Sequence, residues 1–252
     1  MDLAARFSEL KSGFARSFWV ANVLELFERF SFYGSKIVLA VFLAETVGLG
    51  PFGVSLVGLY GFAVYFLPIL AGPVVDRFGF KKSLAACFAI FSLGYFLIGL
   101  SGMPMGQPLV SAVGTKTWVV CALLITAVGG SLIKPCIVGT VARTTTKDTK
   151  ALGYSIYYTL VNIGGWLGPV LASQVRVSLG IAQVLVGASL VSFLLFLGTL
   201  VFFKEPARDP GAEERTLGKV LKDAALVLAN GRFIGFLVIF TGFWVMFWQV
   251  YD

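Results

Sequence analysis

The chain has 252 residues, of which 58% are hydrophobic and only 13% are charged, and its mean hydropathy is +0.88. A soluble domain carries about 25% charged residues, so this composition indicates a polytopic membrane protein and excludes an ordinary soluble domain. Histidine is absent, which removes the most common metal ligand and the most common general base. Cys87, Cys121 and Cys136 lie within apolar runs, so we predict buried thiols, with neither a disulfide framework nor a metal site.

Residues 2–16 alternate between apolar and charged positions and predict a short amphipathic helix on the membrane surface. No cleavable signal peptide is visible there, so we expect the first span to stay as an anchor. Six apolar runs of membrane-spanning length follow. They cover residues 17–43, 52–75, 84–100, 118–141, 151–173 and 181–203.

The end of the chain has a different composition. Residues 204–215 are polar and contain Pro206 and Pro210, residues 216–228 have the one-sided apolar pattern of an interfacial helix, and a seventh apolar run starts near Phe233. We therefore expect three parts in an all-α membrane protein. They are a six-helix bundle at 1–203, a cytoplasmic linker with an amphipathic helix at 204–230, and a truncated seventh transmembrane helix at 231–252.

Basic residues are divided unevenly between the two sides of the predicted membrane. Lys116 and Arg176 fall on one side, while fifteen fall on the other, which the positive-inside rule identifies as cytoplasmic. The fifteen are Arg6, Lys11, Arg16, Arg77, Lys81, Lys82, Arg143, Lys147, Lys150, Lys204, Arg208, Arg215, Lys219, Lys222 and Arg232. The amino terminus is therefore expected in the cytoplasm. This sorting by membrane side also argues against a nucleic-acid partner.

The first span carries four charged residues, Glu25, Glu28, Arg29 and Lys36. On a helix they share an arc of about 140° with Tyr33, so one face is ionic and the opposite face is apolar. Four unpaired charges at mid-bilayer would cost roughly 10 kcal/mol on the insertion scale. We therefore expect them to face partners or a water-filled cavity.

Polar residues of other spans lie at the same expected depth. With a rise of about 1.5 Å per residue, Tyr65 and Asn162 come out at the midplane, and Lys134 about 6 Å to its cytoplasmic side. Pro135 follows Lys134 and is expected to loosen the helix at that point. Transporters place their binding sites in this layer. The alternative is a static ion pair that only fixes helix packing.

Other features have simpler alternatives. Tyr60, Tyr65, Tyr157 and Tyr158 could be packing or interfacial aromatic residues, and Asn162 could form an interhelical hydrogen bond. The glycines of the fourth and fifth spans are most simply close helix contacts, at positions 129, 130, 164, 165 and 168.

Four segments together resemble a known family, the proton-dependent oligopeptide transporters of the major facilitator superfamily. Residues 25–34 (ELFERFSFYG) resemble its ExxERFxYYG signature, and residues 130–135 (GSLIKP) its fourth-helix Lys-Pro motif. Residues 157–164 (YYTLVNIG) resemble its fifth-helix FYxxINxG signature, and residues 72–82 (GPVVDRFGFKK) the general loop motif of the superfamily. The resemblance implies a six-helix amino-terminal bundle of two inverted three-helix repeats.

The resemblance also implies residue roles. Glu25, Glu28, Arg29 and Lys134 would form the proton-coupling group. Substrate would be bound by the set Arg29, Tyr33, Lys36, Tyr65, Lys134, Tyr158 and Asn162. Asp76 and Arg77 would brace one conformation at the cytoplasmic side. Protons would be the coupling ion, with no cofactor and no metal.

The segments depart from the family pattern at several positions. Phe32 replaces a tyrosine, Gly165 replaces a serine, and Lys36 stands in the place of an arginine, whose bidentate fork a lysine cannot make. Residues 243–249 resemble the seventh-helix FWxxxE/DQ segment, but Trp248 occupies its acidic position, unless Asp252 substitutes.

We expect the amino-terminal half of a proton-coupled symporter of di- and tripeptides or related zwitterions in the plasma membrane, the inner membrane if bacterial. Its partners would be the substrate, the lipid bilayer and a carboxy-terminal six-helix half. We do not expect the isolated chain to drive uphill transport. The alternatives are a transporter of another organic solute, a non-transporting half that assembles with a partner, and a seven-helix receptor, which the charge count opposes. An enzyme is the least favoured.

Overall fold

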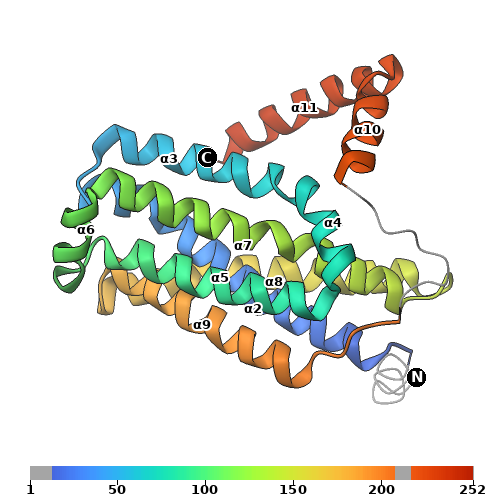
Figure 1. Ribbon diagram of the computed structural model, residues 1–252, viewed down its shortest axis with the longest axis horizontal. Helices are drawn as coiled ribbons and strands as arrows, with labels where there is room; N and C mark the ends of the chain where they lie inside the picture. The colour runs from blue at the N-terminus through green and yellow to red at the C-terminus, as the bar shows by residue number, and fades with distance from the viewer. Residues whose placement is uncertain (1–12, 208–216, 252) are drawn as a thin grey trace. The chain divides into compact units, whose positions relative to one another are not determined.

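The computed structural model describes residues 13–207 and 217–251, and nearly all of these residues are helical (Figure 1). The all-α prediction is therefore confirmed within this part of the chain. Most of the predicted amphipathic helix at 2–16 lies outside it, as do residues 208–215, the side chain of Trp248 and Asp252. The chain divides into two compact units, Met1–Ala212 and Glu213–Asp252.

In the first unit, five long helices lie alongside one another, and a bent pair of shorter helices accompanies them (Figure 1). The long helices are α2 (Arg16–Val41), α5 (Phe80–Leu100), α7 (Thr115–Thr144), α8 (Lys150–Ser178) and α9 (Ile181–Phe202). The bent pair is α3 (Gly50–Phe66) and α4 (Pro68–Phe78), and the short elements are η1 (Phe42–Thr46), η2 (Pro104–Gly106) and α6 (Gln107–Val113). Buried aromatic rings such as Phe18, Phe42, Phe88 and Phe91 fill the core between the long helices.

The second predicted span is bent. It forms α3 and α4, which meet at an angle of 45°. Pro68 begins α4, and because proline has no backbone N–H it cannot continue the hydrogen-bond ladder of α3. Pro135 has a smaller effect than predicted, since α7 remains helical from Thr115 to Thr144.

Helices α2 and α8 approach so closely at two glycines of α8 that no side chain fits at these positions. A Cβ added at Gly164 would lie 2.5 Å from the carbonyl oxygen of Leu26, and one added at Gly168 would clash with the carbonyl oxygen of Phe30. Small residues permit this backbone approach in membrane helices. The close contact brings the inward face of α8 against the charged part of α2.

The segment after α9 holds the start of α5. Two backbone N–H groups, of Phe80 and Lys81, donate to the carboxylate of Glu205 at 2.7 and 2.6 Å. The first N–H groups of a helix have no partner within the helix, so an acceptor there stabilises it. Gly79 precedes them with φ +83°, in the region that glycine adopts without strain.

We predict that Glu205→Ala lowers the stability of the first unit by about 1 kcal/mol, because both N–H groups at the start of α5 lose their acceptor. Thermal unfolding of the purified protein measures the effect. Glu45→Ala, at another exposed carboxylate, serves as the control and is expected to change the unfolding temperature little. Equal shifts for the two variants would contradict the capping role.

Within the described residues, α5, α7 and α9 are each long and apolar enough to cross a membrane. The pair α3–α4 meets the same standard if it counts as one span, and so does the pair α10 (Leu217–Leu228) and α11 (Gly231–Tyr251) of the second unit. Helix α2 is 26 residues long but contains the four charged residues of the first predicted span, and α8 is 29 residues long and rich in glycine and tyrosine. The count of six spans and the inverted repeat stay predictions.

Candidate functional site

The structure gathers ionic groups from two helices in the interior of the first unit. Glu25, Glu28 and Arg29 lie on the buried face of α2, Lys134 reaches them from α7, and the hydroxyl of Tyr157 reaches them from α8. We refer to these five residues as the ionic cluster. The close packing of α2 on α8 at Gly164 and Gly168 positions Tyr157, and α7 positions Lys134.

Within the cluster, Glu28 and Arg29 form a closed pair. The guanidinium of Arg29 donates through Nε to Oε2 of Glu28 and through Nη2 to Oε1 at 2.8 Å. This two-point geometry is the strongest arrangement of an arginine with a carboxylate. Both side chains are buried, and the Phe32 ring lies 4.7 Å from the guanidinium carbon. Each oxygen of Glu28 therefore has a donor.

Glu25 has a different environment, in which a single oxygen carries the contacts. Its Oε1 atom lies 3.2 Å from Nζ of Lys134, 3.2 Å from the hydroxyl of Tyr157 and 3.5 Å from Nε of Arg29. Its Oε2 atom is buried and has no hydrogen-bond partner among the described residues. A proton could bind at Oε2 without displacing any of these contacts. We therefore distinguish Glu25 from Glu28, although the sequence left open which of them releases a base.

The ion pair of Glu25 with Lys134 joins a buried side chain to a partly exposed one. The side chain of Glu25 is 0% exposed, whereas that of Lys134 is 41% exposed. Lys134 is therefore bonded to a buried carboxylate on one side and open on the other. The Glu28–Arg29 pair lacks this property, because both of its members are buried.

The remaining predicted binding residues lie outside the ionic cluster. Lys36, Tyr65, Tyr158 and Asn162 are exposed, and Tyr65 and Tyr158 are each more than half exposed. Tyr33 has intermediate exposure, and its ring lies 5.8 Å from the guanidinium carbon of Arg29. It therefore connects the ionic cluster with the exposed predicted binding residues. The structure thus brings together the predicted proton-coupling residues and leaves most of the predicted substrate residues on exposed helix faces.

The predicted brace lies at the end of α4. Asp76 is partly buried, and Arg77 is exposed with its guanidinium carbon 5.6 Å from the Phe78 ring. The neighbouring turn is the one held by Glu205, so the segment after α9 is bonded beside these two residues.

Two of the departures from the family pattern have a local explanation. Phe32 is buried beside Arg29, so its ring packs in the core instead of lining an open surface. Gly165 faces the ring of Tyr33, where an added Cβ would lie 3.3 Å from Cδ2 of that ring. A serine at position 165 would press on Tyr33, and glycine lets the ring lie against α8.

Tyr157 is the residue of the cluster that the sequence did not assign. The resemblance pointed to its neighbour Tyr158, which the structure leaves exposed. A helical signal was available, because Tyr157 falls on the same face of α8 as Gly153, Gly164 and Gly168, which are all buried. A face of small residues marks the packing side of a membrane helix.

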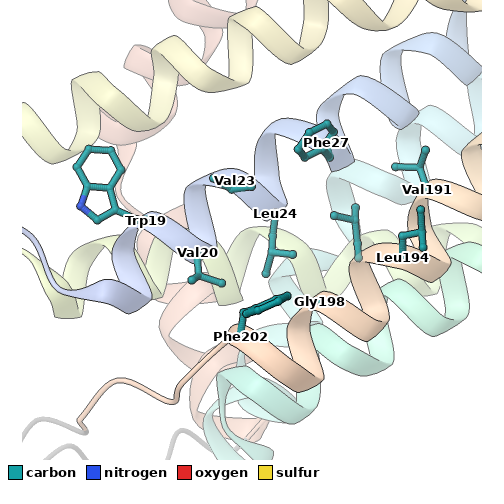
Figure 2. A pocket seen from close by; sticks show the side chains of 10 residues that line it. Trp19, Val20, Val23, Leu24, Phe27, Val191, Leu194, Gly198 and Phe202 are labelled. Atoms are coloured by element: carbon teal, nitrogen blue, oxygen red, sulfur yellow. The ribbon is translucent and has the colours of Figure 1, made fainter. Parts of the chain in front are cut away.

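Three apolar grooves lie elsewhere in the first unit. One of about 510 Å³ lies between α2 and α9, with Trp19, Val23 and Phe27 on one side and Leu194 and Phe202 on the other (Figure 2). A second groove lies where α2, α8 and α9 meet. A third lies between α3 and α7. None of the three includes a charged residue of the ionic cluster. Among the described residues, no group of three or more acidic or cysteine side chains is arranged to hold a metal ion.

Known proteins resemble the chain in sequence. The profile of the Major Facilitator Superfamily matches residues 22–251. A di-/tripeptide transporter of Lactococcus lactis is 30% identical over 200 residues, which cover 74% of this chain and 38% of that protein. Dipeptide and tripeptide permease A of Erwinia pyrifoliae is 25% identical over 202 residues, which cover 79% of this chain and 39% of the permease.

The fold also resembles solved structures. The crystal structure of the peptide transporter POT in complex with sulfate superimposes with a TM-score of 0.63 at 20% identity, over 94% of this chain and 47% of that one. The chain therefore spans about two fifths of the length of these sequence relatives and about half of this structure. The chain therefore resembles this structure in the arrangement of its helices as well as in its helical content.

Proposed function

Because the chain belongs to the Major Facilitator Superfamily, we propose that it forms the amino-terminal half of a proton-coupled symporter of di- and tripeptides. The chain is a multi-pass membrane protein of a transporter family, which argues against an enzyme. Relatives named as di-/tripeptide transporters support the substrate class. The charge count supports a cytoplasmic amino terminus. The membrane would be the plasma membrane, or the inner membrane if the protein is bacterial. The partner would be a carboxy-terminal six-helix half, in the same polypeptide or a second one.

The observation that carries the proposal is the ion pair between buried Glu25 and half-open Lys134. Charged groups inside a membrane bundle are costly and mark ion and substrate pathways. When a proton binds at Oε2, Glu25 becomes neutral and its attraction for the ammonium of Lys134 falls. The carboxylate of the peptide, arriving from the open side, can then draw Lys134 away from Glu25. Glu28 and Arg29 keep their closed pair throughout.

The other residues contribute to substrate binding and to the conformational change. The peptide backbone is bound by hydroxyl, ammonium and amide groups of Tyr33, Lys36, Tyr65, Tyr158 and Asn162. Arg29 belongs to the same predicted binding set. Asp76 and Arg77 brace one conformation at the cytoplasmic side. Substrate and proton leave together when the two bundles rock against each other.

We predict that Glu25→Gln abolishes uphill dipeptide uptake while leaving peptide exchange, because a neutral residue at position 25 no longer responds to the proton gradient. The measurement uses vesicles with the complete transporter that contains this chain, an inward proton gradient and a radiolabelled dipeptide. Asp148→Asn, at an exposed acid before α8, is the matched control and should retain uptake.

Competition by dipeptides, tripeptides, amino acids and other organic solutes then tests the substrate class. Selective competition by the small peptides supports the proposal. Competition by another solute alone would make this a transporter of that solute. Unchanged gradient-driven uptake by Glu25→Gln would show that the coupling residues were assigned wrongly.

A further inference from the structure

Tyr157 joins the two members of the open ion pair through a single hydroxyl. Its oxygen accepts a hydrogen bond from Nζ of Lys134 at 2.7 Å, and its O–H donates to Oε1 of Glu25 at 3.2 Å. Tyr157 itself is 1% exposed, so its hydroxyl lies on the buried side of the pair. The ring is held by the surrounding packing, including the Tyr158 ring at 5.0 Å between centroids.

The hydroxyl is a separate feature from the aromatic ring. The signature that residues 157–164 resemble begins Phe-Tyr, so Tyr157 carries an oxygen that the signature lacks. A phenylalanine would fill nearly the same volume and keep the packing of the ring. Only the bridge between Lys134 and Glu25 would be lost, which makes its contribution measurable by one substitution.

The groups that face Glu25 come from several helices. On α2 itself they are Glu28 and Arg29, on α7 Lys134 and on α8 Tyr157. Helix α3 contributes Tyr60 and α5 contributes Cys87 and Tyr95 to the same buried core, and α9 contains no titratable residue. Among these, Lys134 and Arg29 are the cations and Tyr157 is the neutral donor to the carboxylate.

We propose that Tyr157 is a positioning residue, which holds Lys134 on Glu25 and sets the pH at which the ionic cluster takes up its proton. The proposal rests on the proposed function, since it describes how the coupling pair is controlled. The bond from the hydroxyl stabilises the charged form of Glu25 and therefore opposes protonation. The hydrogen bonds that the structure gives Lys134 are to Glu25 and Tyr157.

Protonation of Glu25 changes the role of the hydroxyl. A neutral carboxyl group holds the ammonium of Lys134 weakly, so the oxygen of Tyr157 becomes the stronger of its two acceptors. Tyr157 then restrains Lys134 until the carboxylate of the peptide replaces it. Without the hydroxyl, the cluster would take up its proton at a higher pH and Lys134 would be released without substrate.

The test compares Tyr157→Phe with Tyr154→Phe, at a partly buried tyrosine on the same helix that has no assigned role. The purified chain is placed in lipid nanodiscs, and infrared difference spectroscopy follows the carbonyl band of a protonated carboxyl group against pH. The band that disappears in Glu25→Gln is assigned to Glu25. We expect Tyr157→Phe to raise the midpoint of that band by about one pH unit and Tyr154→Phe to leave it unchanged. An unmoved midpoint in Tyr157→Phe overturns the inference.

A double-mutant cycle keeps the proposal testable if Tyr157→Phe folds poorly. Unfolding temperatures are compared for Tyr157→Phe in the native chain and in the Glu25→Gln background. A positioning role through Glu25 predicts that the loss caused by Tyr157→Phe shrinks by at least half when Glu25 is already neutral. An equal loss in both backgrounds indicates packing alone and overturns the inference.

Uptake separates this inference from the proposed function. If Glu25→Gln abolishes gradient-driven accumulation while Tyr157→Phe has the native pH profile, the transporter assignment stands and the role of Tyr157 fails. If Glu25→Gln accumulates peptide normally, the proposed coupling fails, whatever Tyr157→Phe does. If both assignments are correct, Tyr157→Phe retains uptake with a pH profile displaced upward.

Discussion

Replacing Lys134 with alanine is expected to destabilise the first unit by about 3 kcal/mol and to abolish gradient-driven uptake. Removal of one partner of a buried ion pair leaves the other charge uncompensated. Glu25 is fully buried and would keep only Arg29 at 3.5 Å and the hydroxyl of Tyr157. The expected loss of stability is near the low end for breaking a buried ion pair, because Lys134 is itself partly exposed. Thermal unfolding and peptide uptake measure the two effects.

The loss of stability in Lys134→Ala should depend on the negative charge of Glu25, which the substitution leaves uncompensated. Adding Glu25→Gln to Lys134→Ala should therefore recover most of the stability but none of the coupling. Lys150→Ala, at an exposed lysine that begins α8, is the control. An equal loss of stability with and without Glu25→Gln would argue against an uncompensated carboxylate.

Replacing Gly164 with alanine is expected to lower stability by about 2–3 kcal/mol, the upper part of the range of about 1–3 kcal/mol for overpacking a tight interface. The new Cβ would lie 2.5 Å from the carbonyl oxygen of Leu26 and 3.0 Å from Cβ of Arg29. Backbone atoms cannot rotate away, so α8 must move off α2. Tyr157 would move with α8, and the bond from its hydroxyl to Glu25 would lengthen.

A matched glycine provides the control for Gly164→Ala. A Cβ at Gly187, on α9, would meet no atom within 4 Å. Alanine there favours the helix, so we expect Gly187→Ala to be neutral or stabilising by up to about 1 kcal/mol. Unfolding temperatures of the two variants are compared in the same detergent. Similar losses for both would show that helix contact at Gly164 does not limit stability.

Much of the fold could be predicted from hydropathy because membrane spans must satisfy their backbone hydrogen bonds internally. The long apolar runs predicted α5, α7 and α9 within a few residues at each end. The bend at Pro68 was missed, since both of its arms are apolar and the pattern runs across the break. The cap at Glu205 was also missed. It joins residues 125 positions apart, and no local pattern encodes such a contact.

The four charged members of the ionic cluster were grouped by the sequence, but neither their pairing nor the presence of Tyr157 was predicted. The helical arc placed Glu25, Glu28 and Arg29 together, and depth placed Lys134 beside them. Which acid meets which base depends on side-chain reach, and the structure pairs Glu28 with Arg29 and Glu25 with Lys134. The spacing of the motifs could not distinguish these pairings. The predicted substrate residues lie on exposed helix faces, and their roles stay predictions.

The balance of charge in the ionic cluster has an electrical consequence. Two carboxylates, one guanidinium and one ammonium sum to zero, so the resting cluster is neutral. Addition of one proton leaves a single positive charge, and a zwitterionic peptide does not alter it. In the symporter proposed above, the loaded cluster would carry this net charge across the bilayer, and a potential of 100 mV contributes about 2.3 kcal/mol for each charge that crosses. Uptake would then be driven by voltage even where the two sides have the same pH.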